Sequence, residues 1–194
     1  MIMLLTICIL VLLTGNLKLA QKHLFLDRDG TLICEEHYLC DPAKVVLERN
    51  VVKGLRRFVH AGYRLVVVSN QSGVGRGLIT EEDVLAVNSR VTQLLAEDQI
   101  SISSWHYCIH SPSDQCACRK PAPGLFQQAA ALHPVVWESS LMVGDKPSDV
   151  QAGLTMGMHS YLVTTGYGLK YIDWAELNHV RVVSCLSSLA ELIL

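Results

Sequence analysis

The sequence predicts a single α/β domain built around a parallel β-sheet. From residue 23 onward, short apolar runs that suit buried strands alternate with segments of helical spacing. The clearest strand candidate is the β-branched run 65–69, which has the length and composition of a strand buried on both faces. Polar residues stand where several of these runs end. The ends of parallel strands meet at one edge of the sheet, so the ligand site is expected there.

Each element follows from a local pattern. A first strand is expected at 23–27, and a helix over 51–60 ends before Gly62. Thr80, followed three residues later by Asp83, forms the capping-box pattern, which predicts the start of a long helix reaching about Glu97. The later strands are expected at 105–108, 140–144, 159–163 and 180–184, and the later helices at 124–132, 148–156 and 187–194. The glycines at 73, 75 and 77 match no phosphate-binding fingerprint, so a flexible turn is expected there.

The composition fits one ordinary globular domain. The chain has 194 residues, 50% of them hydrophobic and 18% charged, with a formal net charge of −2. A domain of this size buries enough surface to fold without disulfides. The balance of charges argues against a disordered chain, a collagen-like repeat or a strongly basic nucleic-acid-binding protein. We expect no nucleic-acid partner, and we expect the chain to act as a monomer.

The N-terminal segment differs from the rest of the chain. Residues 1–13 are apolar except for Thr6, and no charge occurs before Lys18. The run is shorter than the about 20 residues that span a bilayer, and it lacks the positive start and small-x-small exit of a secretory signal. Upstream sequence translated in frame, a membrane anchor and a signal all remain open. We expect residues 1–21 to be an extension and residues 22–194 to form one domain in the cytoplasm.

Two carboxylates follow the first predicted strand. Asp27 and Asp29 stand two residues apart and are followed by Gly30. In such a turn one carboxylate can attack phosphorus while the other handles the proton. A plain Asp-Gly turn is the alternative, because both residues are common in turns. A calcium-binding EF-hand loop is disfavoured, because Thr31 and Tyr38 occupy positions that would need an oxygen ligand and a glutamate.

Cysteine and histidine cluster in one later segment. Cys108, His110, Cys116 and Cys118 supply four soft ligands within eleven residues. This set predicts a tetrahedral zinc site, with unliganded cysteines beside a loop histidine as the alternative. Four protein ligands leave no open position for water, so the ion would be structural and would fix the following residues, Arg119 and Lys120. The other cysteines, to which no role is assigned, are Cys8, Cys34, Cys40 and Cys185.

Four motifs in order resemble those of the haloacid dehalogenase superfamily of aspartate-nucleophile phosphotransferases. The first, Asp-x-Asp-x-Thr, is similar to residues 27–31. Ser69 at a predicted strand end is similar to the second motif, and Lys120 is similar to the third. The fourth, Gly-Asp-x-x-x-Asp, is similar to residues 144–149. The resemblance implies a Rossmann-like sheet flanked by helices, without a large cap and with a zinc-binding loop.

Two longer segments narrow the resemblance. Residues 69–77 and 107–124 are similar to the D-glycero-D-manno-heptose 1,7-bisphosphate 7-phosphatases. This resemblance implies a magnesium-dependent enzyme that removes the 7-phosphate during ADP-heptose synthesis for the lipopolysaccharide core. The related histidinol-phosphatase domains carry the same zinc loop, so histidinol phosphate is the alternative substrate. A catalytically silent zinc-stabilised binding module is a further alternative, but it would usually lack one of four residues that are all present here, Asp27, Asp29, Lys120 and Asp145.

The resemblance also implies a role for each motif residue. Asp27 would be the nucleophile and Asp29 the general acid/base, while Ser69 and Lys120 would stabilise the phosphoryl group. Magnesium would be held by Asp27, by the backbone carbonyl of Asp29 and by Asp145. The residues expected to bind the phosphosugar substrate are Glu35, Glu36, His37, Tyr38, Asn70, Gln71, Ser72, Arg119 and Lys146.

The chain departs from the family at two places. Residues 35–38 read Glu-Glu-His-Tyr where the heptose phosphatases commonly have Asp-His-Gly-Tyr, which leaves the exact sugar contacts open. Ile109 stands where proline is usual between the first two zinc ligands. The role of Asp149 also has two interpretations. It either supports the metal from outside its ligand shell or holds Lys146.

Overall fold

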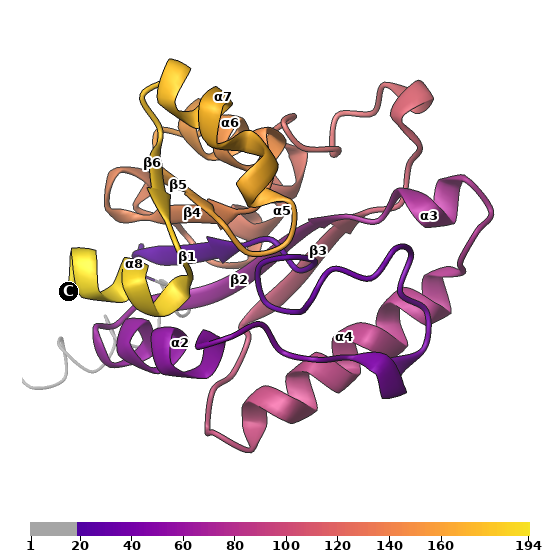
Figure 1. Cartoon of the computed structure of the whole chain (residues 1–194), viewed down its shortest axis with the longest axis horizontal. Helices are drawn as coiled ribbons and strands as arrows, with labels where there is room; N and C mark the ends of the chain where they lie inside the picture. The colour runs from indigo at the N-terminus through magenta and orange to yellow at the C-terminus, as the bar shows by residue number, and fades with distance from the viewer. Residues whose placement is uncertain (1–18) are drawn as a thin grey trace, which may run out of the picture.

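The computed structural model describes residues 19–194 as a six-stranded parallel sheet with helices on both faces (Figure 1). The strands are β1 (His23–Leu26), β2 (Arg64–Asn70), β3 (Ser104–Cys108), β4 (Leu141–Gly144), β5 (His159–Val163) and β6 (Arg181–Val183). They lie in the order β3-β2-β1-β4-β5-β6, and every neighbouring pair is parallel. The order therefore reverses between β1 and β4, and in sheets of this kind ligands bind beyond the carboxyl ends of the strands at such a point.

Two helical layers cover the sheet, and both appear in Figure 1 on opposite sides of the strands. One layer holds α2 (Val51–His60), α4 (Glu81–Ala96) and α8 (Leu186–Ile193), whose apolar side chains share a core with β1, β2, β4 and β5. The other holds α5 (Gly124–Leu132), α6 (Pro147–Thr155) and α7 (Ile172–Leu177). The prediction of a parallel α/β sheet is confirmed.

The alternation of side chains along β1 explains how one strand serves both layers. Leu24 and Leu26 point into the core beside α2, α4 and α8. Phe25 points to the opposite face, where its ring centroid lies 5.1 Å from that of Phe126 and 5.9 Å from that of Trp137. Because successive strand residues face opposite sides, an apolar run without alternation indicates a strand covered on both faces.

Two short helices lie where the sequence analysis predicted none. The expected flexible turn at residues 73–77 contains α3 (Ser72–Gly75), and α7 was not predicted. Gly75 packs against the segment after β3, since its amide donates a hydrogen bond of 2.8 Å to the Ile109 carbonyl. A Cβ at this position would lie 2.6 Å from the Ser111 nitrogen. Gly75 therefore allows α3 to pack closely against the segment after β3, and it does not mark a flexible turn.

The described chain begins inside the predicted extension. Gln21 pairs with Val135 in an isolated bridge, one residue before the expected domain boundary. The apolar run 1–13 and Cys8 lie outside the described residues. Among residues 19–194, no helix has the length and hydropathy needed to cross a membrane.

Helices α2 and α8 approach so closely that only glycine fits at one contact. A Cβ on Gly54 would lie 2.5 Å from the carbonyl carbon of Leu186 and 2.7 Å from the nitrogen of Ser187. Gly54→Ala is therefore expected to lower the free energy of unfolding by about 1–3 kcal/mol, although an alanine in a helix interior normally stabilises by about 0.5–1 kcal/mol. Urea denaturation followed by circular dichroism measures the difference.

Lys53→Ala is the matched control, because Lys53 is the preceding residue of α2 and its side chain is 64% exposed. This change removes only a surface ion pair with Glu191 and should alter the stability by less than about 1 kcal/mol. An unfolding free energy for Gly54→Ala equal to or above that of the natural chain would contradict the close-packing explanation.

Candidate active site

The polar residues predicted at strand ends meet at the carboxyl edge of the sheet. Asp27 directly follows β1, Ser69 is the penultimate residue of β2 and Asp145 directly follows β4. All three side chains are buried. Their strands are adjacent in the sheet, and therefore the parallel topology brings together residues that are far apart in sequence.

A buried lysine joins this group from a loop. The ammonium of Lys120 lies 2.8 Å from Asp27 Oδ1 and 2.7 Å from Asp149 Oδ1, and it also donates to the Val68 carbonyl. Its three N–H groups thus have three acceptors. Burial alone would lower the pKa of Lys120, but the two carboxylates raise the pKa above its usual value, so the ammonium keeps its proton.

The lysine in turn sets the charge of Asp27. Burial would raise the pKa of this carboxyl, but the charges of Lys120 and Lys146 hold the pKa below its usual value. Asp27 is consequently ionised at neutral pH. A buried, ionised carboxylate at the end of a strand has the charge state that a nucleophile requires.

Asn70 fixes the loop that carries Lys120. Its side-chain nitrogen donates to the Lys120 carbonyl at 3.1 Å, and its side-chain oxygen accepts from the Lys120 amide at 3.0 Å. The sequence analysis predicted Asn70 as a substrate-binding residue, and here both ends of its amide hold the backbone of Lys120.

Both carboxylate oxygens of Asp149 have partners. Its Oδ1 accepts from the ammonium of Lys120, while its Oδ2 accepts from the backbone amide of Lys146 at 3.0 Å. The ammonium of Lys146 forms ion pairs with other carboxylates, at 3.3 Å from Glu35 Oε2 and 3.9 Å from Asp145 Oδ1. Asp149 therefore holds the side chain of Lys120 and only the backbone of Lys146.

Three carboxylates form a group that fits a divalent cation. One oxygen from each of Asp27, Asp145 and Asp149 lies within 4.8 Å of the others. Oδ1 of Asp145 is buried and accepts no hydrogen bond from the described residues. Burial and the charge of Asp27 raise the pKa of Asp145 to about 8. Clustered buried carboxylates favour a hard cation with oxygen ligands, such as Mg²⁺.

The side chain of Asp29 is not part of this group of three carboxylates. Its two carboxylate oxygens accept hydrogen bonds from the guanidinium of Arg28 and from the amide of Gln71. Gln71, predicted to contact substrate, is also buried and donates to Ser69 Oγ at 2.7 Å. The sequence analysis did not identify Arg28, which is the largest fully buried side chain of the described chain.

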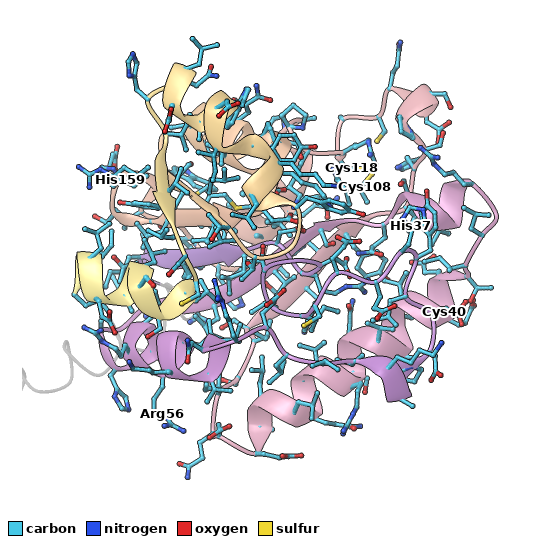
Figure 2. The ribbon with its side chains drawn as sticks, viewed as in Figure 1. His37, Cys40, Arg56, Cys108, Cys118 and His159 are labelled. Atoms are coloured by element: carbon cyan, nitrogen blue, oxygen red, sulfur yellow. The ribbon has the colours of Figure 1, made fainter. Side chains whose placement is uncertain are left out.

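The predicted zinc ligands come together in the loop after β3, where Figure 2 shows Cys108 and Cys118 side by side. The Sγ atoms of Cys108 and Cys116 are 3.5 Å apart, and His110 Nδ1 lies 3.3 Å from Cys118 Sγ. Ligand atoms of a tetrahedral zinc ion lie about 3.5–3.8 Å from one another, as follows from metal–ligand distances of about 2.0–2.3 Å. Burial would raise the pKa of Cys116, but hydrogen bonds from Cys118 and Arg119 lower it to about 7. The four side chains fit a closed zinc site.

A cavity of about 170 Å³ opens beside Asp29. Most of the predicted substrate-binding residues line it, namely Glu35, Glu36, His37, Tyr38, Asn70, Gln71, Ser72 and Lys146. Arg119 is not among the lining residues, and its guanidinium instead donates to the His110 carbonyl at 3.5 Å.

One lining residue, Tyr167, was missed. Its amide donates to Asp145 Oδ2 at 2.8 Å, and its ring centroid lies 4.8 Å from the ammonium of Lys146 and 4.7 Å from that of Lys170. Tyr167 follows β5, so the rule that ligands bind beyond strand ends could have identified it.

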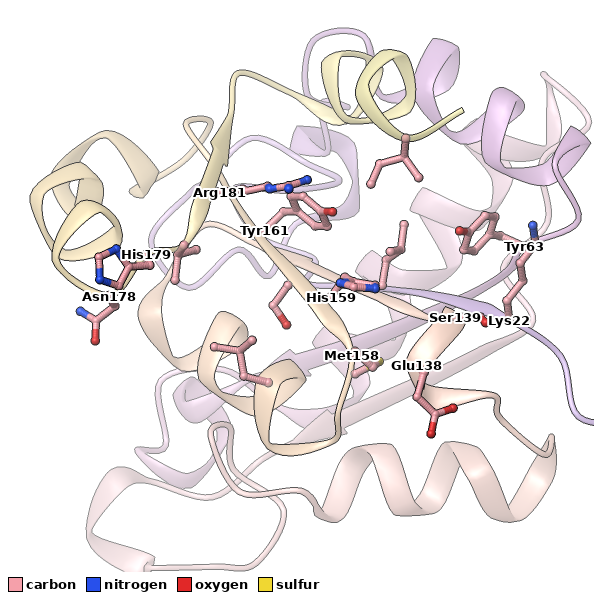
Figure 3. A pocket seen from close by; sticks show the side chains of 15 residues that line it. Lys22, Tyr63, Glu138, Ser139, Met158, His159, Tyr161, Asn178, His179 and Arg181 are labelled. Atoms are coloured by element: carbon pink, nitrogen blue, oxygen red, sulfur yellow. The ribbon is translucent and has the colours of Figure 1, made fainter.

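A larger cavity lies where the strands begin, at the opposite edge of the sheet (Figure 3). It measures about 720 Å³, and Lys22, His159 and Arg181 are among the residues that line it. None of the predicted site residues borders it. The candidate active site is thus identified by its chemistry and its place in the topology rather than by cavity size.

Comparisons with known proteins agree with this geometry. Residues 117–192 match the HAD-hydrolase-like family. A D-glycero-beta-D-manno-heptose-1,7-bisphosphate 7-phosphatase of Helicobacter pylori strain J99 is 36% identical over 163 residues, which cover 83% of this chain and 94% of the relative. A probable D-glycero-D-manno-heptose-1,7-bisphosphate 7-phosphatase of Thermoplasma volcanium is 39% identical over 65% of this chain and 86% of the relative.

A solved structure shows the same arrangement of elements. The D,D-heptose 1,7-bisphosphate phosphatase of B. bronchiseptica, complexed with magnesium and phosphate, superposes with a TM-score of 0.82 at 30% identity. The match covers 89% of this chain and 97% of that protein. Because these matches in sequence and in structure cover 83% and 89% of the chain, it belongs to the D-glycero-D-manno-heptose 1,7-bisphosphate 7-phosphatase family of HAD-like hydrolases.

Proposed function

We propose that the protein is a magnesium-dependent phosphatase that removes the 7-phosphate of D-glycero-D-manno-heptose 1,7-bisphosphate. The observation that carries this proposal is the ionised, buried Asp27 between the ammonium of Lys120 and the carboxylate of Asp145. The relatives described above are named for the heptose bisphosphate, which favours this substrate over histidinol phosphate. Asp27, Asp29, Lys120 and Asp145 are all present, and this disfavours a silent binding module, which would usually lack one of them.

In the proposed mechanism, Asp27 attacks phosphorus in line with the leaving oxygen and forms an aspartyl-phosphate. Lys120, 2.8 Å from Asp27, places positive charge beside the incoming phosphoryl group. Asp29 gives a proton to the leaving alcohol and then takes one from the water that hydrolyses the intermediate. Asp27, Asp145 and the backbone carbonyl of Asp29 would hold Mg²⁺, which supplies charge that offsets repulsion between carboxylate and phosphate.

Ser69 supports the same step through its hydroxyl. Gln71 Nε2 donates to Ser69 Oγ, so the hydroxyl hydrogen of Ser69 remains available to a phosphoryl oxygen. A hydroxyl that accepts one hydrogen bond and donates another is held in a single direction, which suits a group that must meet a phosphate.

The substrate pocket combines positive and negative side chains. We assign Lys146 and Arg119 to the phosphate that is not transferred, and residues 35–38 together with Asn70, Gln71 and Ser72 to the sugar. The charges of Asp27 and Asp145 raise the pKa of Lys146, although burial opposes this effect. Lys146 also pairs with Glu35, which belongs to the segment 35–38 that departs from the usual family sequence. Glu35 would accept hydrogen bonds from sugar hydroxyls.

We further propose that residues 22–194 act as a single monomeric phosphatase domain in the cytoplasm. The zinc ion proposed at Cys108, His110, Cys116 and Cys118 would be structural, and thiolate ligands suit a reducing compartment. A sugar bisphosphate that serves ADP-heptose synthesis is itself an intracellular substrate.

The substrate assignment is tested by comparing phosphate release from two compounds. With Mg²⁺ present, kcat/KM for the 7-phosphate of the heptose bisphosphate is expected to exceed that for histidinol phosphate by at least about 100-fold, since the pocket residues recognise sugar hydroxyls and a second phosphate. Both anomers are measured separately. The reverse ranking would transfer the assignment to histidine biosynthesis.

The nucleophile is tested with Asp27→Asn, which keeps the size of the side chain but removes its negative charge. Phosphate release should fall by at least about 1,000-fold, because the aspartyl-phosphate can no longer form. Circular dichroism confirms that the variant is folded, and Asp41→Asn is the control carboxylate, since Asp41 is exposed, caps the short helix Pro42–Lys44 and does not line the cavity. Unchanged phosphate release by Asp27→Asn would show that the mechanism is wrong.

The zinc site is tested by metal analysis and by Cys118→Ser. Plasma mass spectrometry is expected to find about one zinc ion per chain in the natural protein and clearly less in the variant. The melting temperature of the variant should also fall, because the loop 108–118 is no longer held by a metal ion. Cys40→Ser, a change at an exposed cysteine outside the cluster, should leave both values unchanged. Equal zinc content in all three proteins would rule out this site.

A further inference from the structure

A buried arginine separates the two aspartates of the first motif. Arg28 is only 1% exposed, and each nitrogen of its guanidinium donates at least one hydrogen bond. Nε lies 3.2 Å from both oxygens of Asp29, and Nη2 lies 3.1 Å from Oδ1. Nη1 donates to Asn88 Oδ1 at 2.9 Å and Nη2 donates to Gln71 Oε1 at 3.0 Å. The side chain thus connects the proposed general acid/base to helix α4.

The partners of Arg28 are themselves held. Gln71 accepts from Arg28 through its oxygen, which directs its nitrogen to Asp29 Oδ2 and Ser69 Oγ, both at 2.7 Å. Asn88 is buried in α4, whose packing against the sheet fixes its position. The Arg28 carbonyl accepts from the amides of Leu32 and Ile33 at 2.9 and 3.1 Å, which pins the turn after β1.

Stability alone does not explain this arrangement. Removing a charged side chain from water costs several kcal/mol, and replacement of a buried ion pair by apolar residues is often neutral or stabilising. What a guanidinium provides is geometry, because its planar fork meets a carboxylate with more than one hydrogen bond. Asp29 must meet first a leaving oxygen and then a water, so the direction of its carboxylate controls both proton transfers.

We propose that Arg28 is a positioning residue, which orients the Asp29 carboxylate directly and orients Ser69 through Gln71. Asn88 anchors the guanidinium to helix α4. This proposal rests on the phosphatase function proposed above. Arg28 does not contact the substrate, and its effect on the reaction passes entirely through Asp29 and Gln71.

The test is a double-mutant cycle with Arg28→Met and Asp29→Asn. Methionine keeps the apolar stem in the core and removes the fork. Arg28→Met is expected to lower kcat for the heptose bisphosphate about 10–100-fold and to change KM less than about 3-fold. Asp29→Asn is expected to lower kcat about 100–10,000-fold. The double variant should be no slower than Asp29→Asn alone, because Arg28 has nothing left to position.

A structural role for Arg28 predicts a different result. The two losses would then multiply in the double variant, and this outcome would overturn the proposal. Arg56→Met is the control, since Arg56 forms an exposed ion pair with Asp98 at 2.6 Å and should leave kcat unchanged. Arg28→Lys, which keeps the charge without the fork, should recover less than half of the lost activity.

Two further readouts separate this proposal from the substrate assignment. With p-nitrophenyl phosphate the leaving group needs little protonation, so Arg28→Met should release one equivalent of nitrophenolate rapidly and then stall at hydrolysis of the aspartyl-phosphate. Failure of the natural protein on the heptose bisphosphate alone would reject that substrate and leave this test intact. A crystal structure of Arg28→Met in which Asp29 and Gln71 keep their positions would overturn the proposal regardless of activity.

Discussion

The site depends on one buried cation. Lys120 places its ammonium within 2.8 Å of both Asp27 and Asp149, and without it only the more distant charge of Lys146 would offset the buried carboxylates. Breaking a buried ion pair of this kind typically costs about 3–5 kcal/mol. The same ammonium keeps Asp27 ionised. One interaction therefore stabilises the carboxyl edge of the sheet and keeps the proposed nucleophile ionised.

The cation comes from a loop, and the loop is held by its surroundings. Asn70 binds both backbone polar groups of Lys120, and the four zinc-type ligands gather the preceding residues. Loops are more mobile than strands and helices. A loop that places a charge in a buried site therefore needs such contacts to hold it. The zinc ion proposed at these four ligands would therefore act on catalysis through the position of Lys120.

Space is the second constraint at this edge. Gly30 has a φ of +77°, and a Cβ there would lie 2.3 Å from Asp145 Oδ2. The turn after β1 can approach the carboxylate that follows β4 only because this residue has no side chain. The glycine of the Asp-Gly turn therefore brings the first and fourth motifs together, which neither motif reveals when taken alone. Arg28, two residues before this glycine, is also buried in the turn, and each nitrogen of its guanidinium donates a hydrogen bond.

The sequence by itself determined the sheet, most helices and the residues that meet at its edge, because apolar periodicity and strand-end position are local patterns. It could not determine the partner of each polar group. An arginine between two aspartates suggests a solvated turn, yet tertiary packing buries Arg28 against Asn88, sixty residues away in sequence. The sequence likewise offered two interpretations of Asp149, and neither included Lys120, whose ammonium the fold places 2.7 Å from Asp149 Oδ1. Hydrogen bonds between distant segments exist only once the chain has folded, and these bonds decide which charge each catalytic group carries and where it points.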